Sequence, residues 1–214
     1  MIWFEEKDIP KLKERFSKSL KDDVSINIFA HGDDCKSCSD AISLMEELSS
    51  FDIRFKLEKH SIGSEISNKY GIKDGPVIIL ISEHFPEGNV RYYGIPSGHE
   101  FLVLMEDLEA FSSGKVNLSS SVVEKIKSIN QPTEIKIYTT PMCQYCPAMV
   151  KSAHRFAMIN KNITGSMLAT MEFSSEADEV GVMQVPHITV NGETLYVGSL
   201  PEETFASYIQ DSLA

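Results

Sequence analysis

Two pairs of cysteines with the same spacing constrain this chain more than any other feature of its sequence. The first pair forms the motif CKSC (Cys35 and Cys38), and the second forms CQYC (Cys143 and Cys146). The chain has no other cysteine. In a reducing compartment, such closely spaced pairs are more often redox-active, catalytic or metal-binding than structural. Both motifs therefore mark candidate chemical sites.

The sequence around the two motifs repeats with them. The first cysteines are 108 positions apart (35 to 143), about half of the 214 residues. In each half, a β-branched and aromatic run precedes the motif, and apolar residues at helical spacing follow it. A proline that leads a second β-branched run comes 41 positions after Cys35, at Pro76, and 43 positions after Cys143, at Pro186. This shared order and spacing indicates an internal duplication.

The order of elements in each half predicts the fold class. Each half reads as strand, CxxC at a helix start, strand, helix, proline-led strand, strand and helix, with one more helix in front. The strands expected next to the motifs cover 24–30, 51–60, 134–140 and 162–172. We therefore expect an α/β chain of two tandem units, each a central mixed sheet flanked by helices. The small residues of 112–117 predict a linker, which gives expected domains of 1–114 and 115–214.

Three segments give the chain a specific resemblance to a known family. They are TPMCQYCPAMVKSAHRFA (140–157), MEFSSEADEVGVMQVPHITVNG (171–192) and RYYGIPSGHEF (91–101). In these segments the chain resembles the protein disulfide oxidoreductases of the archaeal and thermophile type, which are glutaredoxin-like and contain two tandem thioredoxin-fold units. The second motif of that family is usually CPYC, so Gln144 departs from the pattern, and CKSC is a less typical first motif.

The resemblance also implies roles for residues near the motifs. Pro76 and Pro186 match the position at which thioredoxin folds carry a cis-proline facing the disulfide. Gly75 and Val185, which precede these prolines, would then offer backbone groups to an extended substrate chain. Tyr145, between the cysteines of the second motif, is a further candidate for substrate contact.

The chemistry of disulfide exchange explains why the motif should stand at a helix start. The attacking species is a thiolate, and a free cysteine with a pKa of about 8.5 is mostly protonated at neutral pH. Free N–H groups and the positive end of a helix dipole at the first cysteine would favour its thiolate. The second cysteine, almost one turn on, could then attack the mixed disulfide. We predict Cys143 and Cys35 as nucleophiles, Cys146 and Cys38 as resolving cysteines, and no metal site.

The two dithiols are not expected to be equal. Asp33 and Asp34 stand beside Cys35, and their charge opposes thiolate formation, whereas the sequence next to Cys143 has no carboxylate. Cys143 is therefore predicted to have the lower pKa and to carry most of the exchange.

The sequence does not identify a proton acceptor for either dithiol. Thioredoxins carry a buried aspartate six residues before the first cysteine, and the matching positions here are Ile137 and Phe29. His154 comes eleven residues after Cys143, about 16 Å along a helix, and is interpreted as a packing or surface residue.

Composition limits the classes of partner and cofactor. The formal net charge of −11 argues against nucleic acid or a membrane surface as a partner, since both attract basic proteins. Residues 1–16 mix both charges without an apolar stretch, and the sequence has no run of about 18 apolar residues, so we expect a cytoplasmic chain. It also has no GxGxxG fingerprint. We therefore expect no cofactor beyond the redox-active disulfides, and reducing electrons from a separate, thioredoxin reductase-like donor.

The leading hypothesis is a thiol–disulfide oxidoreductase that reduces, forms or isomerises disulfides in intracellular proteins. A second hypothesis is an electron relay from a thioredoxin reductase to a peroxiredoxin, similar to the N-terminal module of the alkyl hydroperoxide reductase flavoprotein. A third, of another class, is a holdase or a structural zinc protein. Zinc sites built from two CxxC pairs commonly separate them by about 15–20 residues. Here Cys38 and Cys143 are 105 positions apart in the numbering, which disfavours zinc.

Overall fold

The computed structural model describes residues 3–32 and 35–213, apart from the side chain of Lys36. Asp33 and Asp34, which are expected to oppose the first thiolate, therefore lie outside the described residues. The backbone forms two compact units. The first unit comprises Met1–Gly88 and Leu108–Lys115, and the second comprises Asn89–Asp107 and Val116–Ala214. The chain therefore passes between the units three times rather than once.

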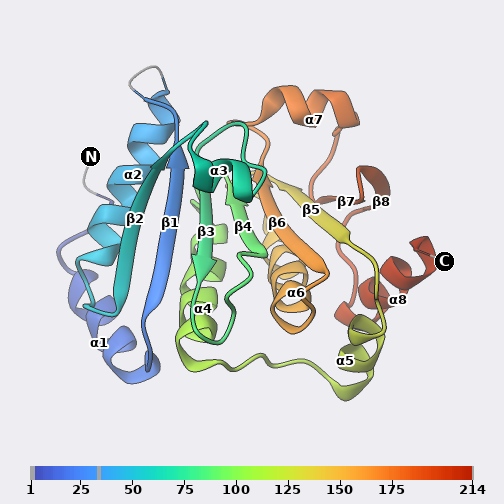
Figure 1. Cartoon of the computed structure of the whole chain (residues 1–214), viewed down its shortest axis with the longest axis horizontal. Helices are drawn as coiled ribbons and strands as arrows, with labels where there is room; N and C mark the ends of the chain where they lie inside the picture. Colours follow the sequence, from blue (N-terminus) through green and yellow to red (C-terminus); the bar gives the residue numbers. More distant parts are fainter. Residues whose placement is uncertain (1–2, 33–34, 214) are drawn as a thin grey trace. The chain divides into compact units, whose positions relative to one another are not determined.

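The strands of the first unit form a mixed sheet in the order β2-β1-β3 (Figure 1). The central strand β1 (Val24–Ala30) is parallel to β2 (Phe55–Ser61) and antiparallel to β3 (Val77–Ile81). Its sequence, VSINIFA, is mostly apolar and β-branched or aromatic, and all of it except Ser25 is buried. Such a continuous apolar strand is typical of a sheet that is covered on both faces.

The first unit contains the helices α1 (Ile9–Ser19), α2 (Lys36–Ser49) and α3 (Glu65–Lys69), together with the end of α4 (Glu100–Ser113) from Leu108 on. An aromatic pair and an arginine side chain stabilise the end of α1. Phe16 of α1 packs edge-on against Phe55 of β2, with ring centroids 4.8 Å apart. Arg54 donates to the Leu20 carbonyl oxygen at the end of α1 and to the Asp52 carboxylate, and this pairing lowers the pKa of Asp52. The guanidinium thereby satisfies a free carbonyl group at a helix end.

The strands of the second unit lie in the order β4-β6-β5-β7-β8 (Figure 1). Their bounds are β4 Val90–Tyr93, β5 Thr133–Thr139, β6 Ile163–Ala169, β7 His187–Val190 and β8 Glu193–Val197. β4, β6 and β5 are parallel to one another, whereas β7 is antiparallel to both β5 and β8. The carboxyl ends of the three parallel strands and the amino end of β7 therefore meet at one edge of the sheet.

The helices of the second unit surround this sheet closely. They are α5 (Ser120–Lys127), α6 (Cys146–Ile159), α7 (Ser174–Val180), α8 (Glu202–Ser212) and the start of α4 (Glu100–Ser113). α6 approaches β6 so closely that a Cβ atom on Gly165 would overlap the Ala153 carbonyl oxygen. A glycine is needed at this contact because any side chain would push the helix away.

A buried polar network ties three elements of the second unit together. The Tyr92 hydroxyl of β4 donates to the Asp107 carboxylate of α4, and His154 Nδ1 of α6 lies 2.6 Å from the same carboxylate oxygen. All three side chains are buried, and burial raises the pKa of Tyr92 well above its usual value. His154 is thus a packing residue of the core, in agreement with its interpretation from the sequence.

The predicted fold class is confirmed: both units are α/β, with mixed sheets flanked by helices in the tandem order that the sequence predicts. The compact units nevertheless interleave along the chain, because Asn89–Asp107 belongs with the second unit. β4, expected as the last strand of the first half, pairs in parallel with β6. The domain limits of 1–114 and 115–214 describe the sequence repeat, and they stay a prediction.

Candidate redox-active site

The CKSC motif lies where β1 ends and α2 begins. Cys35 is the N-cap residue of α2, and its Sγ accepts a hydrogen bond from the Cys38 backbone N–H at 3.2 Å. A disulfide joins the two residues. Cys38 is 1% exposed, whereas Cys35 is partly exposed. The helix start therefore directs a free N–H group at the more accessible sulfur, as predicted.

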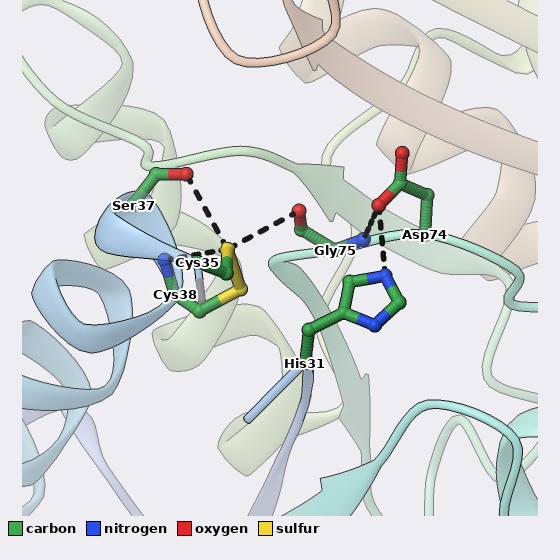
Figure 2. Close-up of a disulfide and its surroundings, with 6 residues drawn as sticks. All are labelled: His31, Cys35, Ser37, Cys38, Asp74 and Gly75. Atoms are coloured by element: carbon green, nitrogen blue, oxygen red, sulfur yellow. Dashed lines mark hydrogen bonds and ion pairs between the residues drawn. A yellow bond between two sulfur atoms is a disulfide. The ribbon is translucent and has the colours of Figure 1, made fainter. Parts of the chain in front are cut away.

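Polar groups surround the sulfur of Cys35 (Figure 2). The Gly75 carbonyl oxygen lies 3.9 Å from it, and the Gly75–Pro76 peptide bond is cis, as the resemblance predicts. Figure 2 shows His31 and Asp74 turned toward one another beside this loop. Asp74 Oδ1 accepts from the Gly75 N–H at 2.8 Å and lies 3.0 Å from His31 Nε2. A carboxylate thus holds the loop that faces Cys35.

The CQYC motif occupies the corresponding edge of the second unit. Here the structure differs from the prediction, because α6 begins at Cys146 rather than at Cys143. Pro147 stands in the first turn of the helix, where proline is favoured, and the residues before Cys146 form turns. The Cys146 N–H still donates to Cys143 Sγ, at 3.0 Å. The first sulfur therefore receives the same backbone bond in both motifs.

The burial of the second pair follows the same pattern as that of the first. A disulfide joins Cys143 to Cys146; Cys146 is 0% exposed and Cys143 is partly exposed. The Val185–Pro186 bond is cis, and the Pro186 carbonyl accepts from the Gly198 N–H. Tyr145 is 68% exposed. This geometry suits an accessible nucleophile, Cys143, with a buried resolving cysteine, Cys146. The roles of all nine predicted site residues stay predictions.

His187, next to Pro186, belongs to the core of the second unit. Its side chain is 4% exposed, and Nε2 lies 2.9 Å from Thr194 Oγ1. Burial lowers the pKa of His187, so its neutral form is favoured.

Sequence reasoning missed one ionisable residue near the second motif, Glu100. The loop that precedes it contacts the CQYC loop: the His99 N–H donates to the Pro141 carbonyl, and a Cβ atom on Gly98 would overlap the same oxygen. Glu100 itself is 2% exposed, and its Oε1 has no hydrogen-bond partner in the structure. Burial raises its pKa to about 7.

A carboxyl group with this pKa changes its protonation state near neutral pH. No motif in the sequence signals Glu100, although Gly98, whose φ is positive at 61°, permits the tight turn before it. No local pattern brings Gly98 and His99 to Pro141, because that contact depends on β4 pairing with β6.

In the described part of the chain, no group of three or more histidine, cysteine, aspartate or glutamate side chains is arranged to hold a metal ion. No helix among those residues is long and apolar enough to cross a membrane.

The fold and the site together define a class: a chain of thioredoxin folds with a CxxC disulfide at each of two sheet edges. Comparison with known families agrees, since residues 133–210 match the thioredoxin domain family.

Two solved structures resemble most of the chain. A protein disulfide oxidoreductase from Aeropyrum pernix is 26% identical, with a TM-score of 0.88 over 99% of this chain and 94% of that one. A structure of the alkylhydroperoxide reductase component AhpF from Enterococcus faecalis is also 26% identical, with a TM-score of 0.87 over 97% of this chain and 100% of that one.

Among curated proteins, an alkyl hydroperoxide reductase component from Pseudomonas aeruginosa is 31% identical over 125 residues, which is 58% of this chain and 24% of that protein. The chain also matches two curated proteins named NADH dehydrogenase, from Bacillus subtilis (25% identical over 88% of this chain) and Ferdinandcohnia aciditolerans (28% over 91%). It spans about a third of the length of each, 35 and 36%.

We predict that the two accessible cysteines differ in thiolate formation. Alkylation of Cys143 is measured in the reduced Cys35→Ser/Cys38→Ser variant, and alkylation of Cys35 in the reduced Cys143→Ser/Cys146→Ser variant. The pH at which the rate is half-maximal should be roughly one unit lower for Cys143 than for Cys35. The reason is that a carboxylate, Asp74, and a carbonyl oxygen lie beside Cys35. Iodoacetamide labelling followed by mass spectrometry measures both profiles, and a higher midpoint for Cys143 would contradict the prediction.

We predict that Glu100 makes the stability of the protein depend on pH. The folded state holds its proton up to about pH 7, whereas the unfolded chain releases it near the ordinary value of 4.5. The stability that the protonated form contributes is therefore complete below 4.5 and is lost as the pH rises through 7. Between pH 5.5 and 8.5, the free energy of unfolding of the wild type should therefore fall by roughly 2 kcal/mol more than that of Glu100→Gln.

Urea unfolding of the oxidised protein at the two pH values measures this difference. Glu179→Gln, on the exposed surface of α7 in the same unit, is the control with the same change of charge. If both variants follow the wild-type pH dependence, Glu100 does not titrate as described.

Proposed function

We propose that this chain is a thiol–disulfide oxidoreductase that acts on disulfides of other proteins. One observation carries the proposal: each unit joins a partly exposed sulfur, which accepts a backbone N–H bond, to a buried sulfur three residues on. The exposed sulfur suits attack, and the buried one suits resolution. Similarity to the Aeropyrum pernix protein disulfide oxidoreductase supports the same function.

In the reducing direction, the Cys143 thiolate attacks one sulfur of a substrate disulfide. The substrate S–S bond breaks, a bond forms between Cys143 and the substrate, and the other substrate sulfur leaves as a thiolate that takes up a proton. Cys146 then loses its proton and attacks Cys143, which releases the second substrate thiol and forms the Cys143–Cys146 disulfide. Two electrons pass from the dithiol to the substrate, and the oxidising direction is the reverse.

The Cys35–Cys38 pair is proposed as a second dithiol of the same kind. No cofactor beyond the disulfides enters the proposed reaction, so sustained reduction needs a separate reductase as the electron donor, and the proposed place of action is the cytoplasm. Whether the chain reduces, forms or isomerises disulfides depends on potentials, since about 30 mV changes the equilibrium of a two-electron couple tenfold.

We predict that the chain accelerates the reduction of insulin by dithiothreitol. Cys143→Ser/Cys146→Ser should slow the reaction almost to the rate of dithiothreitol alone, and Cys35→Ser/Cys38→Ser should keep most of the acceleration. Turbidity of the released insulin B chain measures the rate. The single variant Cys146→Ser should accumulate a mixed disulfide with Cys143, because the resolving thiol is absent, and mass spectrometry detects it.

The other classes of function give different results in these assays. A holdase would suppress insulin precipitation equally well without its cysteines. A zinc protein would release metal on treatment of its thiols with a mercurial and would show no mixed disulfide. Either result would end the proposal.

A second candidate function is electron transfer to a peroxiredoxin, which the similarity to the alkyl hydroperoxide reductase components favours.

We predict that the chain links a thioredoxin reductase to a peroxiredoxin in a reconstituted assay with hydroperoxide. NADPH consumption should then require all three proteins and should stop in the Cys143→Ser/Cys146→Ser variant. The relay is excluded if the chain reduces the peroxiredoxin no faster than dithiothreitol does. If insulin reduction is intact in the same experiment, the general oxidoreductase function remains.

A further inference from the structure

The first dithiol has an ionisable pair beside it that the proposed reaction does not use. His31 follows the last residue of β1, and Asp74 stands two positions before Pro76. His31 Nε2 lies 3.0 Å from Asp74 Oδ1. A carboxylate only accepts hydrogen bonds, so Nε2 carries a proton whether the imidazole is charged or neutral. The pair therefore has no net charge when the imidazole is protonated, and a single negative charge when it is neutral.

A chain of contacts connects this pair to the reactive sulfur (Figure 2). Asp74 Oδ1 accepts the Gly75 N–H at 2.8 Å, and the Gly75 carbonyl oxygen lies 3.9 Å from Cys35 Sγ. Gly75 also packs tightly on β1, since a Cβ atom there would lie 2.9 Å from the Phe29 carbonyl oxygen. One residue spans ~3.5 Å, so the contacts in series place the Asp74 carboxylate within about 10 Å of the sulfur. This is roughly one Debye length at physiological ionic strength, so the charge of the pair acts on Cys35.

The charged groups near the pair differ in how they respond to pH. Those on the neighbouring loops, 32–36, 61–65 and 71–75, are Asp33, Asp34, Lys36, Glu65 and Lys73. Residues 33 and 34 and the side chain of residue 36 lie outside the described part of the chain. Aspartate, glutamate and lysine ordinarily titrate well outside pH 6 to 8, whereas histidine titrates near 6.5.

The other histidine close to this edge, His60 of β2, is turned to a different partner. Its Nε2 lies 3.0 Å from Asn27 Oδ1 and 3.7 Å from Glu58 Oε2. Among the described residues, neither His31 nor Asp74 makes a further ion pair. A change of pH in the neutral range therefore acts on the surroundings of Cys35 through His31.

The second unit has no such pair at the matching positions. It holds Thr139 where the first unit has His31, four residues before the first cysteine of the motif. It holds Gln184 where the first unit has Asp74, two residues before the cis-proline. Neither a hydroxyl nor an amide side chain titrates near neutral pH. The pair therefore belongs to one copy of the repeat and is not a requirement of the fold.

We propose that the His31–Asp74 pair makes the reactivity of the first dithiol depend on pH, because protonation of His31 removes the net negative charge beside Cys35. A nearby negative charge disfavours a thiolate, and its neutralisation lifts that penalty. As the pH falls through the range in which histidine titrates, Cys35 thus keeps more of its thiolate than it would beside Asp74 alone. The proposal rests on the proposed oxidoreductase function and adds a regulation to its first site.

The test measures alkylation of Cys35 by iodoacetamide, an uncharged reagent, in the reduced Cys143→Ser/Cys146→Ser protein at low salt. At about pH 6, His31→Gln should lower the rate roughly threefold, since glutamine donates to Asp74 but carries no charge. At about pH 8 the imidazole is expected to be neutral, so His31→Gln should react at the rate of the parent protein. Asp74→Asn should react roughly threefold faster than the parent at that pH, because it removes the remaining charge.

A second pair in the same unit provides the matched control. His84 Nε2 lies 3.0 Å from Asp22 Oδ2, and Asp22 precedes the amino end of β1, whereas His31 follows its carboxyl end. The strand has seven residues. At ~3.3 Å per residue it spans about 20 Å, or roughly two Debye lengths. His84→Gln and Asp22→Asn should therefore leave the alkylation of Cys35 unchanged at both pH values.

The effects of His31→Gln and Asp74→Asn should also shrink in about 0.5 M salt, which shortens the Debye length. An equal change of rate at both pH values in His31→Gln would show a structural role and overturn the proposal. An unchanged rate in Asp74→Asn at pH 8, or changes of the same size in the control variants, would overturn it as well.

Alkylation needs no disulfide substrate, so its outcome is separate from that of the proposed function. Reduction of bis(2-hydroxyethyl) disulfide by the same variants should show the same ratios of rates at the two pH values. If the alkylation rates follow the expectation but no variant, nor the parent protein, reduces any disulfide, the oxidoreductase function fails while the effect of the pair on Cys35 stands.

Discussion

One hydrogen bond recurs in both motifs, and the rest of the site depends on it: the backbone N–H of the second cysteine donates to the sulfur of the first. The distances are 3.2 Å at Cys35 and 3.0 Å at Cys143. The bond exists because the second cysteine stands in the first turn of a helix, where N–H groups have no partner within the helix. Once the disulfide is reduced, a donor at this position favours the thiolate form of the accessible cysteine, while the other sulfur lies buried within reach.

The sheets supply the rigid frame that this bond requires. In the second unit, three parallel strands end at one edge, so the loops that carry the dithiol, the cis-proline and Glu100 converge there. Close packing of α6 on Gly165 and the buried Tyr92–Asp107–His154 network fix the helix that carries Cys146. Because both bonds of this buried network meet at one oxygen of Asp107, the network favours a single arrangement of these elements.

The two sites share chemistry but differ in their surroundings. Around Cys35, the Asp74 carboxylate, His31 and a carbonyl oxygen make a polar, charged edge. Around Cys143, the loops are uncharged and present exposed methionines. One repeated scaffold thus holds two dithiols with different surroundings, because loops change more freely than the strands that hold them.

The sequence by itself determined the fold class and the order of elements around each CxxC motif, because periodicity and β-branched runs act within a few residues and need no distant partner. The cis bonds before Pro76 and Pro186 came from the family resemblance, and the structure has both. The sequence analysis placed the start of the CQYC helix at Cys143, three residues before the start of α6 at Cys146. The two motifs differ here because the residues before Pro147 form turns.

Only the tertiary structure decided that β4 pairs with β6, that Glu100 is buried without a partner for its Oε1, and that His99 contacts the loop before Cys143. Each of these depends on contacts between segments far apart in the chain. No local pattern encodes such contacts, because burial and proximity are set by how the elements pack.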